Sequence, residues 1–232
     1  MIKPQPPAPS PQALILASSS PRRRELLQEA GYDFTVVPPA EDVECGVCSE
    51  FGPAGLVADL AYRKASAVHR QLLGTPQSES RSPQSIVLAA DTVAECDGFI
   101  LGKPRDEDDA RAMLTKLSGR EHRVLTGVCL FPLFPPLPPA EGHPAIRVAV
   151  TKLRMDQLTG QQLDEYLASG QWEGKAGGFG YQDRLDWVHI VEGSESNVVG
   201  LPMELLAEML AELASASSEH EVKVPTLNRP AE

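Results

Sequence analysis

An apolar run that leads directly into three serines, a proline and three arginines is the segment that most constrains the fold. Residues 14–17 are typical of a short buried strand, and Pro21 fits the first turn of a helix, where its missing N–H costs nothing. Ser20 stands at the N-cap position of that helix. A strand that meets a helix N-terminus in this way predicts a phosphate-binding corner, because free N–H groups and the helix dipole attract anions.

Two arginines in the first turn of the same helix bear on that prediction. Cations are disfavoured at a helix N-terminus, so Arg22 and Arg23 indicate that a multiply charged anion binds there. The alternative interpretation is a solvated basic helix start that pairs with nearby carboxylates. The segment alone favours neither interpretation over the other.

The acidic composition argues against a surface that binds nucleic acid polymers. The chain of 232 residues has a formal net charge of −11, whereas proteins that bind nucleic acid backbones usually carry a basic face. A local basic cluster in an acidic protein instead fits a small phosphorylated ligand. No apolar run of about 18 residues is present, so no membrane partner is expected.

The composition predicts three parts. Residues 1–12 are a Pro-rich leader expected to be disordered, 13–213 one domain, and 214–232 a polar tail expected to fray. The leader lacks the apolar core of a secretory signal, which favours a cytoplasmic protein.

Short apolar runs alternate with helix-type periodicity along the domain. This alternation is typical of an α/β protein and predicts a mixed central sheet flanked by helices. The expected strands are 14–17, 32–37, 86–90, 122–131, 145–155 and 187–191, with a hairpin turning at 96–98. The expected helices are 21–30, 53–73, 106–117 and 159–168, and a last one that opens at 200–202 and ends near 213.

Cysteine spacing offers one weak metal signal. Cys45 and Cys48 have the C-x-x-C spacing of half a zinc site or of a redox pair. No second pair completes a zinc site, and the surrounding segment is an acidic loop. We therefore expect structural or incidental thiols.

Polar residues that follow the predicted strands are candidates for chemistry. Asp91 comes directly after an apolar strand, at the carboxyl end where α/β sheets place ligands. There it can bind a divalent cation or accept a proton from water, and the alternative is the cap of a turn. Lys64 and Lys103, taken singly, are typical surface lysines. The glycine-rich segment 174–180 can bring backbone N–H groups to a ligand, or is simply a flexible loop.

Taken in order, eight short motifs resemble the Maf family of nucleoside triphosphate pyrophosphatases. They are Leu-Ala-Ser-Ser-Ser-Pro-Arg-Arg at 16–23, Leu-Ala-Tyr-Arg-Lys-Ala at 60–65, Ala-Ala-Asp-Thr-Val at 89–93, Leu-Gly-Lys-Pro-Arg at 101–105, Leu-Ser-Gly at 117–119, Val-Leu-Thr-Gly-Val at 124–128, Lys-Ala-Gly at 175–177 and Asn-Val-Val-Gly-Leu-Pro at 197–202. The resemblance covers residues from about 14 to 210. The resemblance implies an ITPase-like α/β fold with two lobes around an active-site cleft.

The resemblance also implies a reaction, the hydrolysis of a nucleoside triphosphate to a monophosphate and pyrophosphate. Asp91 matches the family's general base, and Asp91 with Glu44 would hold Mg²⁺ or Mn²⁺, although Glu41 or Asp42 matches the second carboxylate equally well. The residues matching substrate contacts are Ser18, Ser20, Arg22, Arg23, Lys64, Thr92, Lys103, Lys175 and Gln182. The family resemblance suggests a homodimer. It also leaves an alternative function, that of a non-catalytic nucleotide-binding regulator of septum formation and cell division.

Two of these positions resemble the branch of the family that prefers dTTP and UTP. These are Thr92 and Gln182, and a neutral amide at the latter can both donate to and accept from a pyrimidine. The chain departs from the family's usual loop in having no glycine after Gln182. Phe179 and Tyr181 are placed either to stack on a base or to pack the loop.

Overall fold

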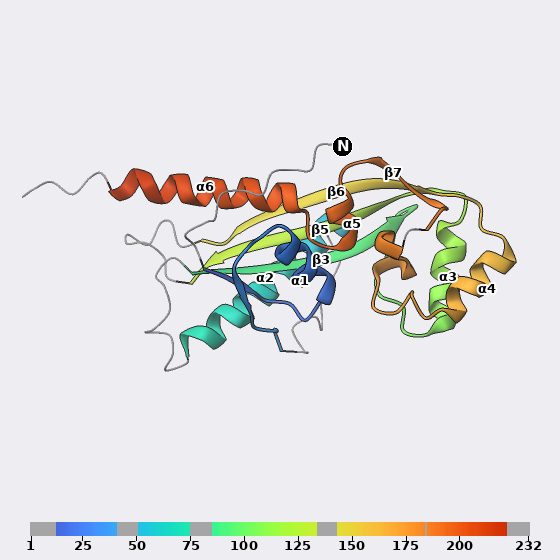
Figure 1. Cartoon of the computed structure of the whole chain (residues 1–232), viewed down its shortest axis with the longest axis horizontal. Coiled ribbons are helices and arrows are strands. Elements are labelled where there is room, and N and C mark those ends of the chain that lie inside the picture. The colour runs from blue at the N-terminus through green and yellow to red at the C-terminus, as the bar shows by residue number, and fades with distance from the viewer. Residues whose placement is uncertain (1–12, 41–50, 75–84, 134–142, 184, 222–232) are drawn as a thin grey trace, which may run out of the picture.

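The structure, a computed structural model, describes residues 13–40, 51–74, 85–133, 143–183 and 185–221. Its centre is a mixed seven-stranded sheet of strand order β2-β1-β3-β5-β6-β7, with β4 paired to β3 (Figure 1). The strands are β1 (Leu14–Leu16), β2 (Phe34–Val36), β3 (Ile86–Cys96), β4 (Phe99–Leu101), β5 (Glu121–Pro132), β6 (Ala145–Met155) and β7 (Val188–Glu192). Only the pairings of β1 with β2 and β3 are parallel among these strands.

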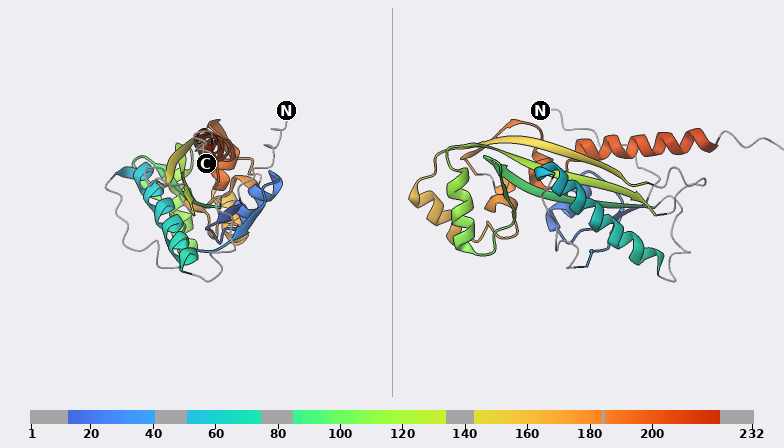
Figure 2. Two further views of the ribbon diagram at one scale, coloured as in Figure 1. Left: turned by 90° about the vertical axis from the view of Figure 1, so that its left-hand side faces the viewer. Right: turned by 180° about the vertical axis from the view of Figure 1, so that it is seen from behind.

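Helices flank this sheet, as predicted. They are α1 (Pro21–Glu29), α2 (Gly52–Leu73), α3 (Glu107–Leu117), α4 (Gly160–Ala168), α5 (Glu195–Val199) and α6 (Met203–Glu221). The end-on view in Figure 2 shows α2 and α1 on different sides of the sheet. Apolar side chains of α2 pack with Val87, Ala89 and Cys129 on one face, whereas α1 and α6 pack with Leu14 and Leu88 on the other.

The long strands β3, β5 and β6 connect two lobes, one at each end of the sheet (Figure 1). The first lobe holds α1, α2 and α6, and the second holds α3 and α4. A separate cluster of buried side chains fills the second lobe, with Leu114 of α3, Leu167 of α4 and Trp187 among its members. Two lobes built on one mixed α/β sheet agree with the fold that the family resemblance implies.

Strand β3 is longer than the sequence predicts, and Asp91 therefore has a different position in the strand from the one expected. The expected strand ends at residue 90, but pairing with β5 continues through Asp91 and Thr92 to residue 95. The chain then turns at Asp97 and Gly98, both with positive φ (53° and 81°), so the predicted hairpin is confirmed. Asp91 therefore lies in the middle of a strand, and its expected position at a strand end is wrong.

One edge of β3 is left open between its two shorter neighbours. Strand β1 pairs with β3 over residues 86–88, and β4 pairs with it over residues 94–96. No described strand covers residues 89–93 on that edge. This gap in the strand pairing is the place where a ligand can approach the middle of β3.

The ends of the helices test the capping predictions. Asp106 caps α3 by accepting from the Asp109 N–H at 2.8 Å, and Thr159 forms a capping box with Gln162 at α4. Ser20 stands at the N-cap of α1, but its side chain makes no capping bond.

The C-terminal helices differ from the prediction. The short helix α5 has no strong sequence signal, and its Ser194 cap was not predicted. The last helix continues to residue 221 instead of ending near residue 213.

Several predictions lie outside the described residues. The leader and the acidic segment with Glu41, Asp42, Glu44, Cys45 and Cys48 fall among them. Within the described part, Cys96 and Cys129 are buried free thiols, and burial raises the pKa of Cys129 to about 12. No helix found in the described ranges combines the length and apolar character needed to cross a membrane.

Candidate active site

A pocket lies at the open edge of β3, between the two lobes. It is walled by the start of α1, the middle of β3, the turn before α3, the glycine-rich segment and the end of α5. The predicted site residues that line it are Ser20, Arg22, Arg23, Asp91, Thr92, Lys103, Lys175 and Gln182. Among its described lining residues Asp91 is the one carboxylate, against four cationic side chains. Lys175 is compensated by Asp183, so three cations, Arg22, Arg23 and Lys103, provide the positive charge that suits an anionic ligand.

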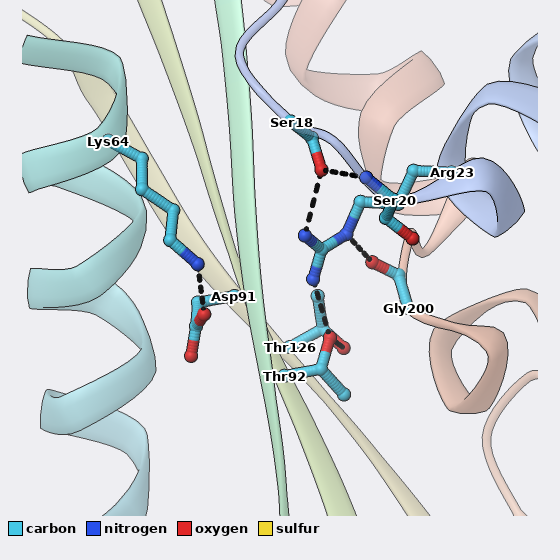
Figure 3. A network of polar contacts seen from close by, with 8 residues as sticks. All are labelled: Ser18, Ser20, Arg23, Lys64, Asp91, Thr92, Thr126 and Gly200. Carbon is cyan, nitrogen blue, oxygen red and sulfur yellow. Dashed lines mark hydrogen bonds and ion pairs between the residues drawn. The ribbon is translucent and has the colours of Figure 1, made fainter. Parts of the chain in front are cut away.

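Asp91 is held from the α2 side of the sheet. Lys64 donates from Nζ to Oδ1 of Asp91 at 2.5 Å, and both residues are buried (Figure 3). A buried carboxylate is costly unless a cation offsets it, and Lys64 provides that cation. Lys64 is not among the residues that line the pocket, and its described contact with the site is the ion pair with Asp91.

Arg23 lies on the opposite face of β3 and is fixed by three hydrogen bonds. Its guanidinium donates to the Gly200 carbonyl at 2.7 Å, to Oγ of Ser18 at 3.2 Å and to Oγ1 of Thr92 at 3.1 Å (Figure 3). Ser18 also accepts from the Ser20 N–H at 3.2 Å, which fixes the turn before α1. Asp91 and Thr92 are adjacent in sequence, yet alternation along the strand sends them to different partners.

The hydroxyl of Thr92 is part of a directed chain of hydrogen bonds. Thr126 donates its one proton to the Asn197 carbonyl at 3.1 Å, so the 3.0 Å contact between the two threonine oxygens has Thr92 as donor. Thr92 in turn accepts from Arg23. Asn197, which is buried, donates to the Val124 carbonyl and to Thr151. Thr126 and Asn197 both lie in the motifs quoted from the sequence, but their roles were not predicted, because their hydrogen-bond partners come from other elements of the fold.

Arg22 connects α1 to the glycine-rich segment of the second lobe. Its Nη2 donates to the Gly174 carbonyl at 2.8 Å. Burial lowers the pKa of Arg22, and the charge of Asp183 opposes that effect. Lys103 is exposed at the pocket, and Gly102 just before it accepts a hydrogen bond from the Gly177 N–H at 2.9 Å. The predicted basic cluster is thus assembled from both lobes.

Lys175 and Gln182 lie at either end of the glycine-rich wall. Lys175 forms an ion pair with Asp183, so its cation is already compensated where the sequence predicts a substrate contact. Gln182, in the 3₁₀ turn Tyr181–Asp183, has an exposed side chain on the pocket. Phe179 is a buried residue that packs edge-to-face on His122 at 5.3 Å and also reaches the pocket.

The described residues offer few side chains that could bind a metal ion. They contain no group of three or more His, Cys, Asp or Glu that could hold an ion. Asp91 accepts from Lys64 through Oδ1, and Oδ2 receives no hydrogen bond from the described residues. A carboxylate oxygen to which no described residue donates suits Mg²⁺, which usually takes one or two carboxylates and completes its shell with phosphate oxygens and water.

Comparisons with known proteins identify the relatives of the chain. It is 47% identical over 222 residues to the dTTP/UTP pyrophosphatase of Rhodopirellula baltica, covering 95% of this chain and 90% of that protein. It is 38% identical to the dTTP/UTP pyrophosphatase of Pyrococcus abyssi, covering 85% and 94%, and 42% identical to that of Brucella abortus, covering 86% and 90%.

A family model described as Maf-like protein matches residues 13–213. This match spans both lobes, every strand of the sheet and the pocket between the lobes. Together with relatives at up to 47% identity over most of the chain, it establishes that the chain belongs to the Maf family.

Proposed function

We propose that this chain is a nucleoside triphosphate pyrophosphatase that hydrolyses the α–β phosphoanhydride and prefers dTTP and UTP. The observation that carries the proposal is the pocket itself, where one carboxylate, paired with Lys64, faces a basic cluster from both lobes. The relatives at 38–47% identity are named dTTP/UTP pyrophosphatases, which supports this choice of reaction and substrate.

The triphosphate binds to the basic side of the pocket. It brings about four negative charges, and Arg22, Arg23 and Lys103 with the free N–H groups of α1 offset them. The three hydrogen bonds that hold Arg23 keep its guanidinium in place before the ligand arrives. Little ordering of that side chain is then needed on binding.

Asp91 acts as the general base. A water attacks the α-phosphorus, its proton passes to the Asp91 carboxylate, and the bond to the bridging oxygen breaks so that pyrophosphate leaves. Asp91 would also hold a divalent cation, Mg²⁺ or Mn²⁺, with Glu44 or a neighbouring carboxylate as its second protein ligand. The metal, when bound, neutralises charge on the phosphate oxygens. Lys64 holds Asp91 in place from the α2 side.

Base selection rests on Gln182. Its amide can accept from a pyrimidine ring N–H and donate to a carbonyl, which a carboxylate cannot do. Thr92 contributes through Arg23, since its own proton is directed to Thr126. The substrates and products are free nucleotides. We therefore place the protein in the cytoplasm, where such nucleotides are found.

A panel of nucleotides tests the function. Purified protein with Mg²⁺ should release pyrophosphate and no orthophosphate, with higher kcat/KM on dTTP and UTP than on ATP and GTP. In Gln182→Glu the efficiency on dTTP should fall more than that on GTP. Release of orthophosphate would refute the cleavage position, and equal efficiency on all four bases would refute the preference.

A further inference from the structure

Asp183 directly follows Gln182 in the 3₁₀ turn Tyr181–Asp183, and it makes two specific contacts. It forms an ion pair with Lys175, and its Oδ2 accepts a hydrogen bond from the Tyr166 hydroxyl at 3.1 Å. The Lys175 and Asp183 side chains are only 11% and 10% exposed. A pair this buried restrains the backbone on both sides, because breaking it would leave a desolvated charge.

The ion pair joins the two ends of the glycine-rich wall of the pocket. Gly180 lies against it: a Cβ at this position would be 2.7 Å from Lys175 Nζ and 2.8 Å from Asp183 Oδ2. Gly180 does not have a positive φ, so its backbone conformation does not require a glycine. Glycine is needed there because any side chain at position 180 would collide with the ion pair.

Tyr166 ties the ion pair to the core of the second lobe. Its ring packs edge-to-face on Trp187 at 5.5 Å, and both residues are buried. Burial and the nearby Asp183 raise the pKa of Tyr166, so the phenol keeps its proton and donates it. Asp183 is thus anchored to α4, a rigid element outside the pocket.

We propose that Asp183 is a positioning residue for base selection, which fixes the turn carrying Gln182 and keeps Lys175 away from the triphosphate. Gln182 directly precedes Asp183 in the 3₁₀ turn, so a shift of the anchored residue moves the amide. A Lys175 released from Asp183 would attract any triphosphate regardless of its base. Both effects of losing the anchor lower discrimination. The inference rests on the proposed function, since it concerns how the same site chooses its nucleotide.

The test is Asp183→Asn, which keeps the shape and an acceptor for Tyr166 but removes the charge. Two probes are titrated by calorimetry, α,β-imido-dUTP and α,β-methylene-ATP, and kcat and KM are measured for dTTP and ATP. The preference for the uracil probe over the adenine probe should fall about tenfold, and the ratio of KM for ATP to KM for dTTP should fall with it, while kcat on dTTP stays nearly unchanged. A purely structural loss of fold would lower kcat and both affinities together.

A matched control tests whether the loss of preference is specific to Asp183 or follows from removing any buried carboxylate. Glu95 on β3 is another buried carboxylate paired with an arginine, Arg123, at 2.7 Å, and it lies outside the pocket lining. Glu95→Gln should keep the wild-type preference. If Asp183→Asn fails to fold, Tyr166→Phe removes the anchor's hydroxyl alone and should lower the preference in the same direction.

The outcomes distinguish the two proposals. If folded Asp183→Asn or Tyr166→Phe prefers the uracil probe as strongly as the wild type does, the positioning role is overturned. The proposed function is unaffected by that result. A wild-type protein that binds neither probe and hydrolyses no triphosphate overturns the function and this inference with it.

Discussion

Asp91 and Lys64 meet between a strand and a helix, and their contact makes the role of Asp91 testable. Asp91→Asn keeps the shape and still accepts from Lys64, but it cannot take a proton. We expect kcat on dTTP to fall by about 10²–10⁴, with binding of α,β-imido-dUTP largely kept and an unchanged circular dichroism spectrum. A variant that retains most of its turnover would show that the carboxylate serves structure alone.

His122 should make stability depend on pH. Burial lowers its pKa to about 4, against a smaller opposing contribution from the Arg120 backbone. Between its ordinary value of about 6.5 and pH 4 the unfolded chain binds a proton that the folded protein does not, so stability falls as the pH falls through that window. From pH 7 to pH 5 this residue should cost about 2 kcal/mol.

Urea unfolding of the wild type and His122→Phe at the two pH values measures that cost. The substitution keeps a ring against Phe179 and removes the titrating group. Its free energy of unfolding should therefore drop less from pH 7 to pH 5 than that of the wild type. Equal drops in the two proteins would mean that His122 titrates normally.

Single residues also mark where sequence reasoning succeeds and where it stops. The basic residues of the pocket could be predicted, because cations at a helix N-terminus contradict helix electrostatics and so indicate an anion. The pairing of Lys175 with Asp183 could not be predicted, since it depends on how a loop closes in space. Thr126 could not be predicted either: a strand threonine gives no sign of the hydrogen bond that its hydroxyl makes.

Among the elements, the contact of α2 with the sheet depends on one glycine. Gly127 on β5 stands opposite Asp91, and a Cβ there would lie 2.3 Å from the Val57 carbonyl oxygen of α2. Gly127→Ala must push α2 outward, and overpacking of this kind costs about 1–3 kcal/mol. Because α2 carries Lys64, we expect both a lower Tm and a lower kcat.

Gly160 provides the matched control for that substitution. It is the first residue of α4, its φ is not positive, and a Cβ added there would meet no other atom within 4 Å. Gly160→Ala should leave Tm and kcat close to wild type. A Gly127→Ala protein that behaves like this control would show that the helix does not rest on the strand as closely as the structure has it.

Element ends were predictable where a local signal exists. The caps of α3 and α4 and the Asp-Gly turn after β3 follow from side chains that bond their own backbone or tolerate positive φ. The length of β3 did not follow, because Asp91 and Thr92 interrupt the apolar pattern while pairing with β5 extends the strand. Tertiary partners, and not local preference, decide where that strand ends.

At the scale of the whole molecule, the pocket takes its walls from both lobes, so a bound nucleotide should stabilise the entire fold. A ligand present at 100 times its Kd adds about 2.7 kcal/mol to the free energy of unfolding. Thermal melts with α,β-imido-dUTP should show a concentration-dependent rise in Tm for the wild type. Arg23→Ala should lose most of that rise, and an equal rise in both proteins would exclude Arg23 from binding.

The alternation of side chains along β3 limits how the length of this strand can vary. One residue inserted between Leu88 and Asp91 would turn the aspartate toward Arg23 and a different residue toward Lys64, since the pleat has a period of two. Two inserted residues would restore the faces but slide both groups by about 6.8 Å along the strand. Substitutions in β3 can therefore have graded effects, whereas an insertion or deletion there dismantles the site in one step. Length variation among homologues should accordingly be confined to segments outside residues 86–96.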